Sequence, residues 1–396
     1  MIGCLRRLAL IFICLATQFH SSAFPMERVW TRMTGQTPAE APPLVVDLDQ
    51  DGTEEILILN RSGQLLHWSG DGEPLGPGQD GTVAQLPEGL WSSPLVPLRL
   101  ENGGMRLLAC SVEGLLVAID SEFEIVWTHQ LAGKTQFGRA IPLVTGQADS
   151  TGRIYIGDLS GTVTCMDFTG AEIWKRTLEG GPCRAPLSLA PGSIGVLVVA
   201  GGELCCLGDE SGDVHWKTRL NDPILSKPIV LETNDQPLIL CGSGEGSLYA
   251  LSTDGDILWK ASIGDQIDSS ITTFQDSEGR TVILCLGLWG NLYALNPDGK
   301  TIWKSLFEAK SRACPIVIDG DRDGRSEIYV PTYKHRLYVF DEEGAFLDDV
   351  RLTGVANPSA VPIANQVVDG TDILVVTAAN CAYRFTPGAP SFVYDY

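Results

Sequence analysis

The amino-acid sequence predicts an all-β fold, an eight-bladed β-propeller of four-stranded antiparallel blades. A hairpin pattern recurs along the chain, as in GSLYALSTDGDILWK from Gly246 and GNLYALNPDGKTIWK from Gly290. Eight copies of it follow one another at intervals of 41 to 51 residues. The 43 glycines and 23 prolines among 396 residues provide for many turns. A repeat of about 44 residues is the length of one propeller blade.

Each copy of the pattern contains a β-hairpin. In the copy that begins at Gly246, Asp254-Gly255 separates two apolar runs, and this dipeptide favours a hairpin because the turn needs positive φ. The second run of each central copy contains a tryptophan: Trp127, Trp174, Trp216, Trp259 and Trp303. The copies themselves begin at Gly63, Gly114, Gly161, Gly202, Gly246, Gly290, His335 and Asn380.

Two further strand-like runs lie between one tryptophan and the next copy. The first follows a proline or a small residue, as in PIVIDGD from Pro315, and the second leads into the next turn, as in EIYVPTY from Glu327. Each unit therefore supplies four short strands. One such sheet cannot bury both of its faces, whereas a closed ring of sheets covers the faces and protects the edges.

Two segments are candidates for closing the ring. Residues 28–35, RVWTRMTG, resemble the last strand of a unit, although no hairpin precedes them. We expect them to pair with the C-terminal blade. Residues 391–396 could occupy the same place, and the sequence leaves the choice open. In either arrangement, residues 24–396 form a single domain.

The first 23 residues have the features of a secretory signal peptide. Arg6 and Arg7 precede an apolar run at residues 8–16, which is too short to span a bilayer. Ser21-Ser22-Ala23 places small residues at the positions that signal peptidase requires, so we expect cleavage after Ala23. The rest of the sequence contains no run that could span a membrane. These features predict an exported protein, located in the periplasm or outside the cell.

The charge and the cysteines exclude several classes of function. The formal net charge of −21 disfavours nucleic acid and anionic lipid as partners. The 11 cysteines have neither the spacing of a disulfide framework nor a C-x-x-C zinc pair. Cys110, Cys241 and Cys285 occupy equivalent strand positions, which predicts small buried apolar side chains. We expect the chain to be a monomer.

Two loops have the pattern D-x-D-x-D-G-x-x-E, at residues 47–55 and 319–327. Calcium is a hard cation that takes six to eight oxygen ligands, and alternating carboxylates around a glycine turn supply them. The alternative is a polar turn without a metal. Structural calcium is therefore predicted at Asp47, Asp49, Asp51 and Glu55, and at Asp319, Asp321, Asp323 and Glu327.

Four cations and two aromatic residues are candidates for partner binding. Arg139, Arg184, Lys227 and Arg312 come just before the innermost strands, where side chains face the central channel, and could attract an acidic ligand. The alternative is pairing with neighbouring acids. In two adjacent turns, Trp289 and Tyr333 could contact a peptide or a glycan. The alternative is that they are isolated exposed aromatics.

The hairpin, with G-x-L-Y-A-L followed by Asp-Gly and Trp-Lys, resembles the repeat of pyrroloquinoline-quinone-type β-propellers. The resemblance implies eight blades, with the tryptophan of each blade docked against its neighbour. That family includes quinoprotein dehydrogenases and non-catalytic scaffolds, such as the outer-membrane assembly lipoprotein of Gram-negative bacteria. The two acidic loops resemble the calcium loops of FG-GAP propeller repeats, which lie between the first and second strands of a blade.

The vicinal pair Cys205-Cys206 bears on enzymatic activity. The resemblance to quinoprotein dehydrogenases implies a disulfide between adjacent cysteines against the cofactor, but strand alternation points these two side chains to opposite faces. The chain is also shorter than those enzymes. We expect no catalytic residues and no bound pyrroloquinoline quinone, but an exported, calcium-stabilised scaffold for a protein or glycan partner. The alternative is a small quinone-dependent oxidoreductase acting on alcohols or sugars.

Overall fold

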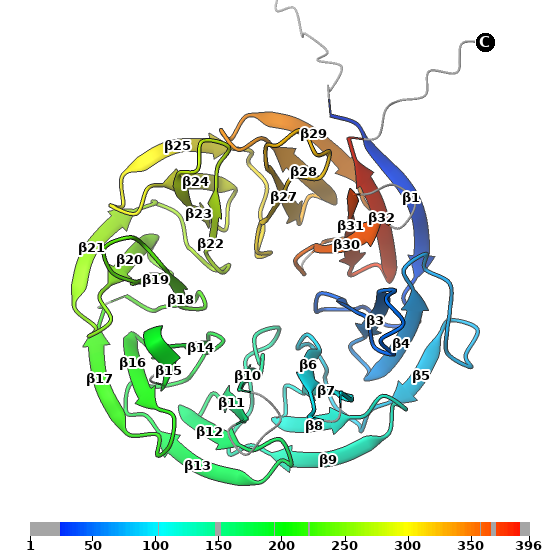
Figure 1. The fold of residues 1–396 in the computed structure, drawn as a ribbon, viewed down its shortest axis with the longest axis horizontal. Coiled ribbons are helices and arrows are strands. Elements are labelled where there is room, and N and C mark those ends of the chain that lie inside the picture. Colours follow the sequence, from blue (N-terminus) through cyan, green and yellow to red (C-terminus); the bar gives the residue numbers. More distant parts are fainter. Residues whose placement is uncertain are drawn as a thin grey trace, which may run out of the picture.

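The computed structural model describes residues 24–101, 103–146, 152–193, 195–220, 222–356, 358–365 and 370–388. The described chain forms eight four-stranded antiparallel sheets arranged as the blades of a ring, which confirms the predicted fold (Figure 1). The expected signal peptide and the candidate strand at residues 391–396 lie outside the described residues. Within these ranges, no helix is long and apolar enough to cross a membrane.

In seven blades the strands are consecutive in the chain, with the first strand nearest the channel and the fourth at the rim (Figure 1). The first two blades are β2 (Leu44–Val46), β3 (Glu55–Leu59), β4 (Gln64–Ser69) and β5 (Thr82–Gln85), then β6 (Val96–Arg99), β7 (Met105–Cys110), β8 (Leu115–Ile119) and β9 (Ile125–Gln130). The next two are β10 (Leu143–Thr145), β11 (Arg153–Gly157), β12 (Thr162–Met166) and β13 (Glu172–Thr177), then β14 (Ser188–Leu189), the 3₁₀ turn Pro191–Ser193, β15 (Gly195–Ala200), β16 (Glu203–Gly208) and β17 (Val214–Arg219).

The second half of the ring repeats this order. The fifth and sixth blades are β18 (Ile229–Leu231), β19 (Leu238–Gly242), β20 (Ser247–Leu251) and β21 (Ile257–Ser262), then β22 (Thr272–Gln275), β23 (Thr281–Leu286), β24 (Asn291–Leu295) and β25 (Thr301–Leu306). The seventh is β26 (Ile316–Ile318), β27 (Glu327–Thr332), β28 (Arg336–Phe340) and β29 (Phe346–Arg351). The eighth contains β30 (Val361–Asn365), β31 (Gly370–Thr377) and β32 (Cys381–Pro387).

The N-terminal strand closes the ring. β1 (Met26–Met33) pairs antiparallel with β32 and supplies the outermost strand of the eighth blade (Figure 1). Arg384 on β32 is 4% exposed. Its Nε donates to Asp372 Oδ2 at 2.6 Å, and its Nη1 donates to the carbonyl of Gly70 in the first blade at 2.6 Å. This side chain therefore joins the last blade to the first.

A tryptophan–glycine contact fastens each of several blades to the next. The ring of Trp259 on β21 lies against Gly299 in the hairpin turn of the following blade, where a Cβ would lie only 2.7 Å from the indole. The indole N–H donates to the carbonyl of Pro297 at 2.9 Å. The same contact recurs between Trp30 and Gly72, Trp127 and Gly170, Trp174 and Gly212, Trp216 and Gly255, and Trp303 and Gly344.

Burial follows from this stacking. The third strand of a blade is covered on both faces by its neighbours, so that β20 is buried along its whole length. The outermost strand covers the rim, and residues of β21 alternate between exposed and half-buried. The core is therefore divided into apolar layers between blades, and each layer is completed only when the next blade is in place.

Candidate calcium loops and the channel mouth

The two acidic loops occupy the same place in two blades. The first connects β2 to β3, and the second connects β26 to β27. Because neighbouring strands are antiparallel, these loops lie on one face of the disc. The loops that enter the innermost strands lie on the opposite face. The structure therefore separates the acidic loops from the channel-lining cations.

The backbone of the first acidic loop is folded around its own carboxylates. Leu48 N–H donates to Glu55 Oε2 at 2.7 Å, and Gly52 N–H donates to Asp47 Oδ2 at 3.1 Å. Gln50 and Gly52 have φ of 64° and 90°, so both residues adopt a left-handed backbone conformation. These two bends of the backbone bring the carboxylates of one loop together.

The second acidic loop repeats this geometry. Gly320 N–H donates to Glu327 Oε2 at 2.9 Å, and Gly324 N–H donates to Asp319 Oδ2 at 3.1 Å. Arg322 and Gly324 have φ of 63° and 90°. In each loop one oxygen from each of four carboxylates lies within 4.8 Å of the others. The two sets are Asp47, Asp49, Asp51 and Glu55, and Asp319, Asp321, Asp323 and Glu327.

Buried carboxylate oxygens show that both loops fit a cation. Oδ1 of Asp47 and Oδ1 of Asp319 are buried and have no hydrogen-bond partner, an arrangement that costs free energy unless a cation or water satisfies it. Glu327 is 4% exposed. Burial raises its pKa to about 7, and the nearby carboxylate of Asp321 adds to the effect. Clustered acidic oxygens on a tight loop are the ligand set that calcium takes.

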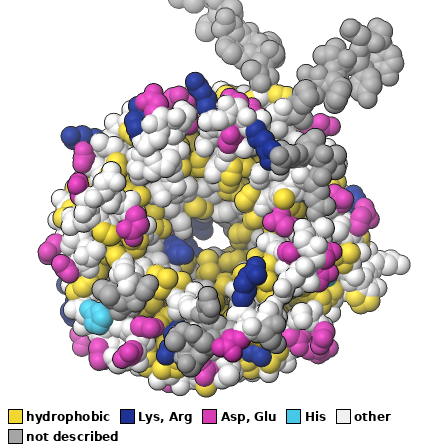
Figure 2. Space-filling view, viewed as in Figure 1, with side chains coloured by type: hydrophobic (Ala, Val, Ile, Leu, Met, Phe, Trp, Pro, Cys, Tyr) yellow, Lys and Arg dark blue, Asp and Glu magenta, His cyan; other side chains and the backbone are white. Residues whose placement is uncertain are grey.

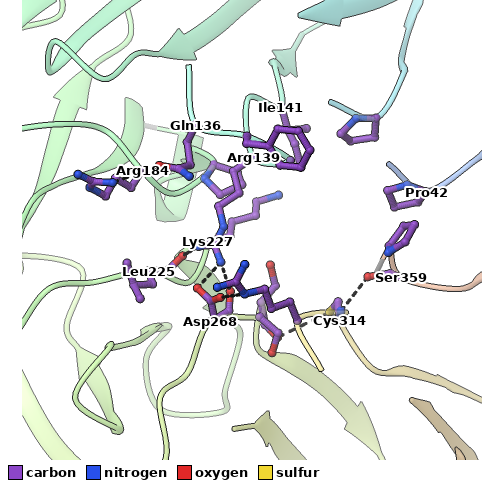
Figure 3. A pocket seen from close by; sticks show the side chains of 18 of the residues that line it. Pro42, Gln136, Arg139, Ile141, Arg184, Leu225, Lys227, Asp268, Cys314 and Ser359 are labelled. Atoms are coloured by element: carbon purple, nitrogen blue, oxygen red, sulfur yellow. Dashed lines mark hydrogen bonds and ion pairs between the residues drawn. The ribbon is translucent and has the colours of Figure 1, made fainter. Parts of the chain in front are cut away.

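The four predicted cations line one cavity of about 440 Å³ at the mouth of the central channel. Each side chain comes from the loop just before the innermost strand of its blade, and Lys and Arg side chains lie beside the central opening (Figures 2 and 3). We call them the mouth cations: Arg139, Arg184, Lys227 and Arg312. The acidic residues Asp268 and Glu40 line the same cavity.

Two of the mouth cations share one carboxylate. Arg139 pairs with Asp268 Oδ1, and Arg312 Nε lies 2.7 Å from Asp268 Oδ2. Arg139 also donates to the carbonyls of Asp268, at 2.7 Å, and of Leu225. The side chains of Asp268 and Arg139 are 6% and 18% exposed, so this pair is largely withdrawn from water, whereas the Arg312 side chain is 49% exposed.

The other two mouth cations have different surroundings. Among the described residues, no carboxylate forms an ion pair with Lys227 or Arg184. Arg184 Nη1 donates to the amide oxygen of Gln136 at 3.3 Å. Lys227 lines the same cavity as Arg139 (Figure 3), and burial lowers the pKa of its ammonium group.

The two predicted aromatics lie on either side of a lysine. Lys310 Nζ is 5.3 Å from the ring centroid of Trp289 and 5.3 Å from that of Tyr333. Trp289 is 62% exposed and sits in the turn between β23 and β24, whereas Tyr333 sits in the equivalent turn of the next blade. Both turns are on the face of the channel mouth. No motif in the sequence points to Lys310. Its loop follows the hairpin of β24 and β25, which returns the chain to the face on which Gly290 lies.

The vicinal cysteines lie on opposite faces of β16. Cys205 packs in the apolar layer that contains Tyr155 and Val198, whereas Cys206 packs in the layer that contains Ile239. Both are free thiols, and burial raises the pKa of each to about 11. Their surroundings are those of core side chains.

Comparisons with solved structures agree with the fold. The crystal structure of BamB from Moraxella catarrhalis matches 91% of this chain and 100% of its own, with a TM-score of 0.67 and 17% identity. Two structures of BBS1N in complex with ARL6DN, one soaked with mercury and one with lead, match at a TM-score of 0.54 and 10% identity. They cover 92% and 91% of this chain, and 97% and 96% of their own. At these identities the likeness concerns the fold alone.

The sequence itself also has a family match. No curated protein matches it. The family model described as outer membrane protein assembly factor BamB matches residues 160–312 and 244–382. These overlapping matches span more than half of the chain. The chain therefore belongs to the family of the outer membrane protein assembly factor BamB.

Proposed function

We propose that this protein is an exported, non-enzymatic scaffold that binds a protein partner during assembly at the outer membrane. The family and the rigid ring support a binding role in general. The observation that carries the proposal is the cluster of the exposed Trp289 with the half-buried Lys310 and Tyr333 on the face of the channel mouth. Aromatic and cationic side chains are enriched among the residues that dominate protein interfaces.

The geometry of this cluster suits a partner surface. Lys310 holds Trp289 and Tyr333 in one arrangement through cation–π contacts, which lowers the entropy lost on binding. Trp289 N–H also donates to the buried carboxylate of Asp265 at 2.9 Å, so the backbone of the exposed turn is fixed. A partner therefore meets a preorganised aromatic surface.

Photo-crosslinking tests the proposal. A photoreactive phenylalanine analogue at position 289 should give a discrete product with one envelope protein, and the product should weaken with Lys310→Ala. Position 346 is the matched control, because Phe346 is 55% exposed but lies on the rim strand β29. Equal products from both positions, or a glycan as the captured species, would contradict a protein partner at this face.

We further propose that calcium occupies both acidic loops and makes them rigid. The orphaned oxygens of Asp47 and Asp319, and the buried Glu55 and Glu327, support this assignment. In each loop these carboxylates would hold the ion. The role would be structural, since the loops lie on the face opposite the proposed partner surface.

Export and the absence of enzymatic activity are part of the same proposal. The mature protein should begin at Phe24, which N-terminal sequencing of the envelope fraction would check. Purified protein given calcium and pyrroloquinoline quinone should show neither cofactor absorbance nor dye reduction with alcohols or sugars. Dye reduction would instead support the oxidoreductase alternative.

A further inference from the structure

The mouth of the central channel has an excess of positive charge. The four mouth cations face two acidic side chains, Asp268 and Glu40, in one cavity. Both oxygens of Asp268 already contact arginines. Glu40 Oε1 lies 3.7 Å from Arg61 Nη1, so this carboxylate also faces a cation outside the set.

No carboxylate among the described residues forms an ion pair with Lys227 or Arg184. An ammonium group withdrawn from water is unfavourable unless an anion pairs with it. Lys227 is half-buried in this cavity. Because the chain carries a net charge of −21, most of its surface repels anions, and a local cationic cavity is a marked exception.

We propose that the channel mouth binds a small oxyanion with two or more negative charges, a phosphate or a dicarboxylate, held by Lys227 and Arg184. The volume of about 440 Å³ is in the range of small-molecule sites. Gln266 and Ser270 line the same cavity and provide neutral hydrogen-bonding groups. This site goes beyond the scaffold function and does not depend on it.

Titration calorimetry with succinate and with inorganic phosphate, at constant ionic strength, tests the site. Either dianion should bind, whereas acetate and chloride should not. Lys227→Met together with Arg184→Gln should weaken binding at least about tenfold, since charge-assisted hydrogen bonds are lost. Lys175→Met is the matched control, because Lys175 is exposed on the rim strand β13 and should leave binding unchanged.

A second variant should act in the opposite direction. Asp268→Asn removes the carboxylate that occupies Arg139 and Arg312, so it should tighten dianion binding severalfold, an effect that misfolding would not produce. Binding of phosphate alone would assign phosphorylated ligands, and binding of succinate alone would assign dicarboxylates. The proposal would be overturned if neither dianion gave a heat of binding, or if the double variant bound the dianions as tightly as the unmodified protein.

Discussion

Arg139 and Asp268 form an ion pair across the central channel. Arg139 precedes β10 and Asp268 precedes β22, so the two residues belong to blades three places apart in the ring. The guanidinium of Arg139 also contacts the carbonyl of Leu225, which precedes β18. One side chain therefore links three blades at the channel mouth, independently of the seams between neighbouring blades.

Removal of Asp268 should destabilise the protein more than removal of Arg139. Asp268→Asn leaves two arginines without their carboxylate, whereas Arg139→Met leaves Asp268 paired with Arg312. Removing one partner of a buried ion pair costs about 3–5 kcal/mol, and the cost here should be smaller because the Arg312 side chain is 49% exposed. Urea unfolding in the absence of phosphate and carboxylic acids would measure the difference.

An exposed ion pair provides the control for this comparison. Arg280 lies 2.7 Å from Asp276, and its side chain is 60% exposed. Arg280→Gln should change the free energy of unfolding by less than about 1 kcal/mol. If Arg139→Met proved more costly than Asp268→Asn, the shared carboxylate would not be the centre of this network.

Calcium should raise the thermal stability of the protein. At about 100 times its dissociation constant, an ion that binds only the folded state adds about 2.7 kcal/mol per site. For a chain of this size, that corresponds to roughly 3–5 °C in Tm for each loop. Differential scanning calorimetry with calcium and then with excess chelator would measure it.

Single substitutions should divide the calcium effect between the loops. Asp49→Asn and Asp321→Asn each remove one exposed carboxylate from one loop and should each abolish about half of the shift. Asp276→Asn is the control, since Asp276 lies outside both acidic loops. It accepts hydrogen bonds from the backbone N–H groups of Glu278, at 3.1 Å, and Arg280, at 2.8 Å, and it pairs with the Arg280 side chain. A double variant that still responds fully to calcium would contradict both sites.

The fold could be predicted because its signals are local and repeated. Gly299 needs a left-handed φ of 77° and lies under Trp259, so one position of the repeat serves both the turn and the seam. The carboxylates of each acidic loop lie within nine residues, which also makes them visible in the sequence. Either terminus could have supplied the last rim strand, because a rim strand pairs along only one edge and its pattern is weak.

The pairing of the mouth cations could not be predicted in the same way. Arg139 and Asp268 are 129 residues apart, and the sequence predicted only that Arg139 faces the channel. Which cation reaches which carboxylate depends on side-chain length and on the angle between blades. Lys310 was missed for a similar reason, because its role arises only when two turns from adjacent blades meet.

The cysteines should be almost unreactive in the native protein. Burial raises the pKa of Cys241 and of Cys110 to about 12, so their thiolates are scarce at neutral pH. Burial raises the pKa of Cys314 as well, but this thiol is partly accessible and lines the channel-mouth cavity. Mass spectrometry after iodoacetamide treatment should therefore find Cys314 labelled first and the others only on unfolding, and Cys314→Ser should abolish the native labelling.

A disulfide would appear in the same experiment. Loss of two hydrogens from a peptide that contains Cys205 and Cys206 would contradict the placement of these side chains in separate apolar layers. Labelling of either residue at the native rate of Cys314 would contradict their burial.

Two glycines with the same backbone conformation should respond differently to alanine. Gly299 and Gly279 have φ of 77° and 75°. A Cβ at Gly299 would lie 2.7 Å from the Trp259 ring, whereas a Cβ at Gly279 would have no other atom within 4 Å. Gly279→Ala should cost about 1 kcal/mol from backbone strain alone. Gly299→Ala should cost about 3 kcal/mol, because the indole must also move. In a Trp259→Ala background the cost of Gly299→Ala should fall to that of Gly279→Ala, which a double-mutant cycle by urea unfolding would detect. Equal costs in the unmodified background would show that the seam does not depend on this contact.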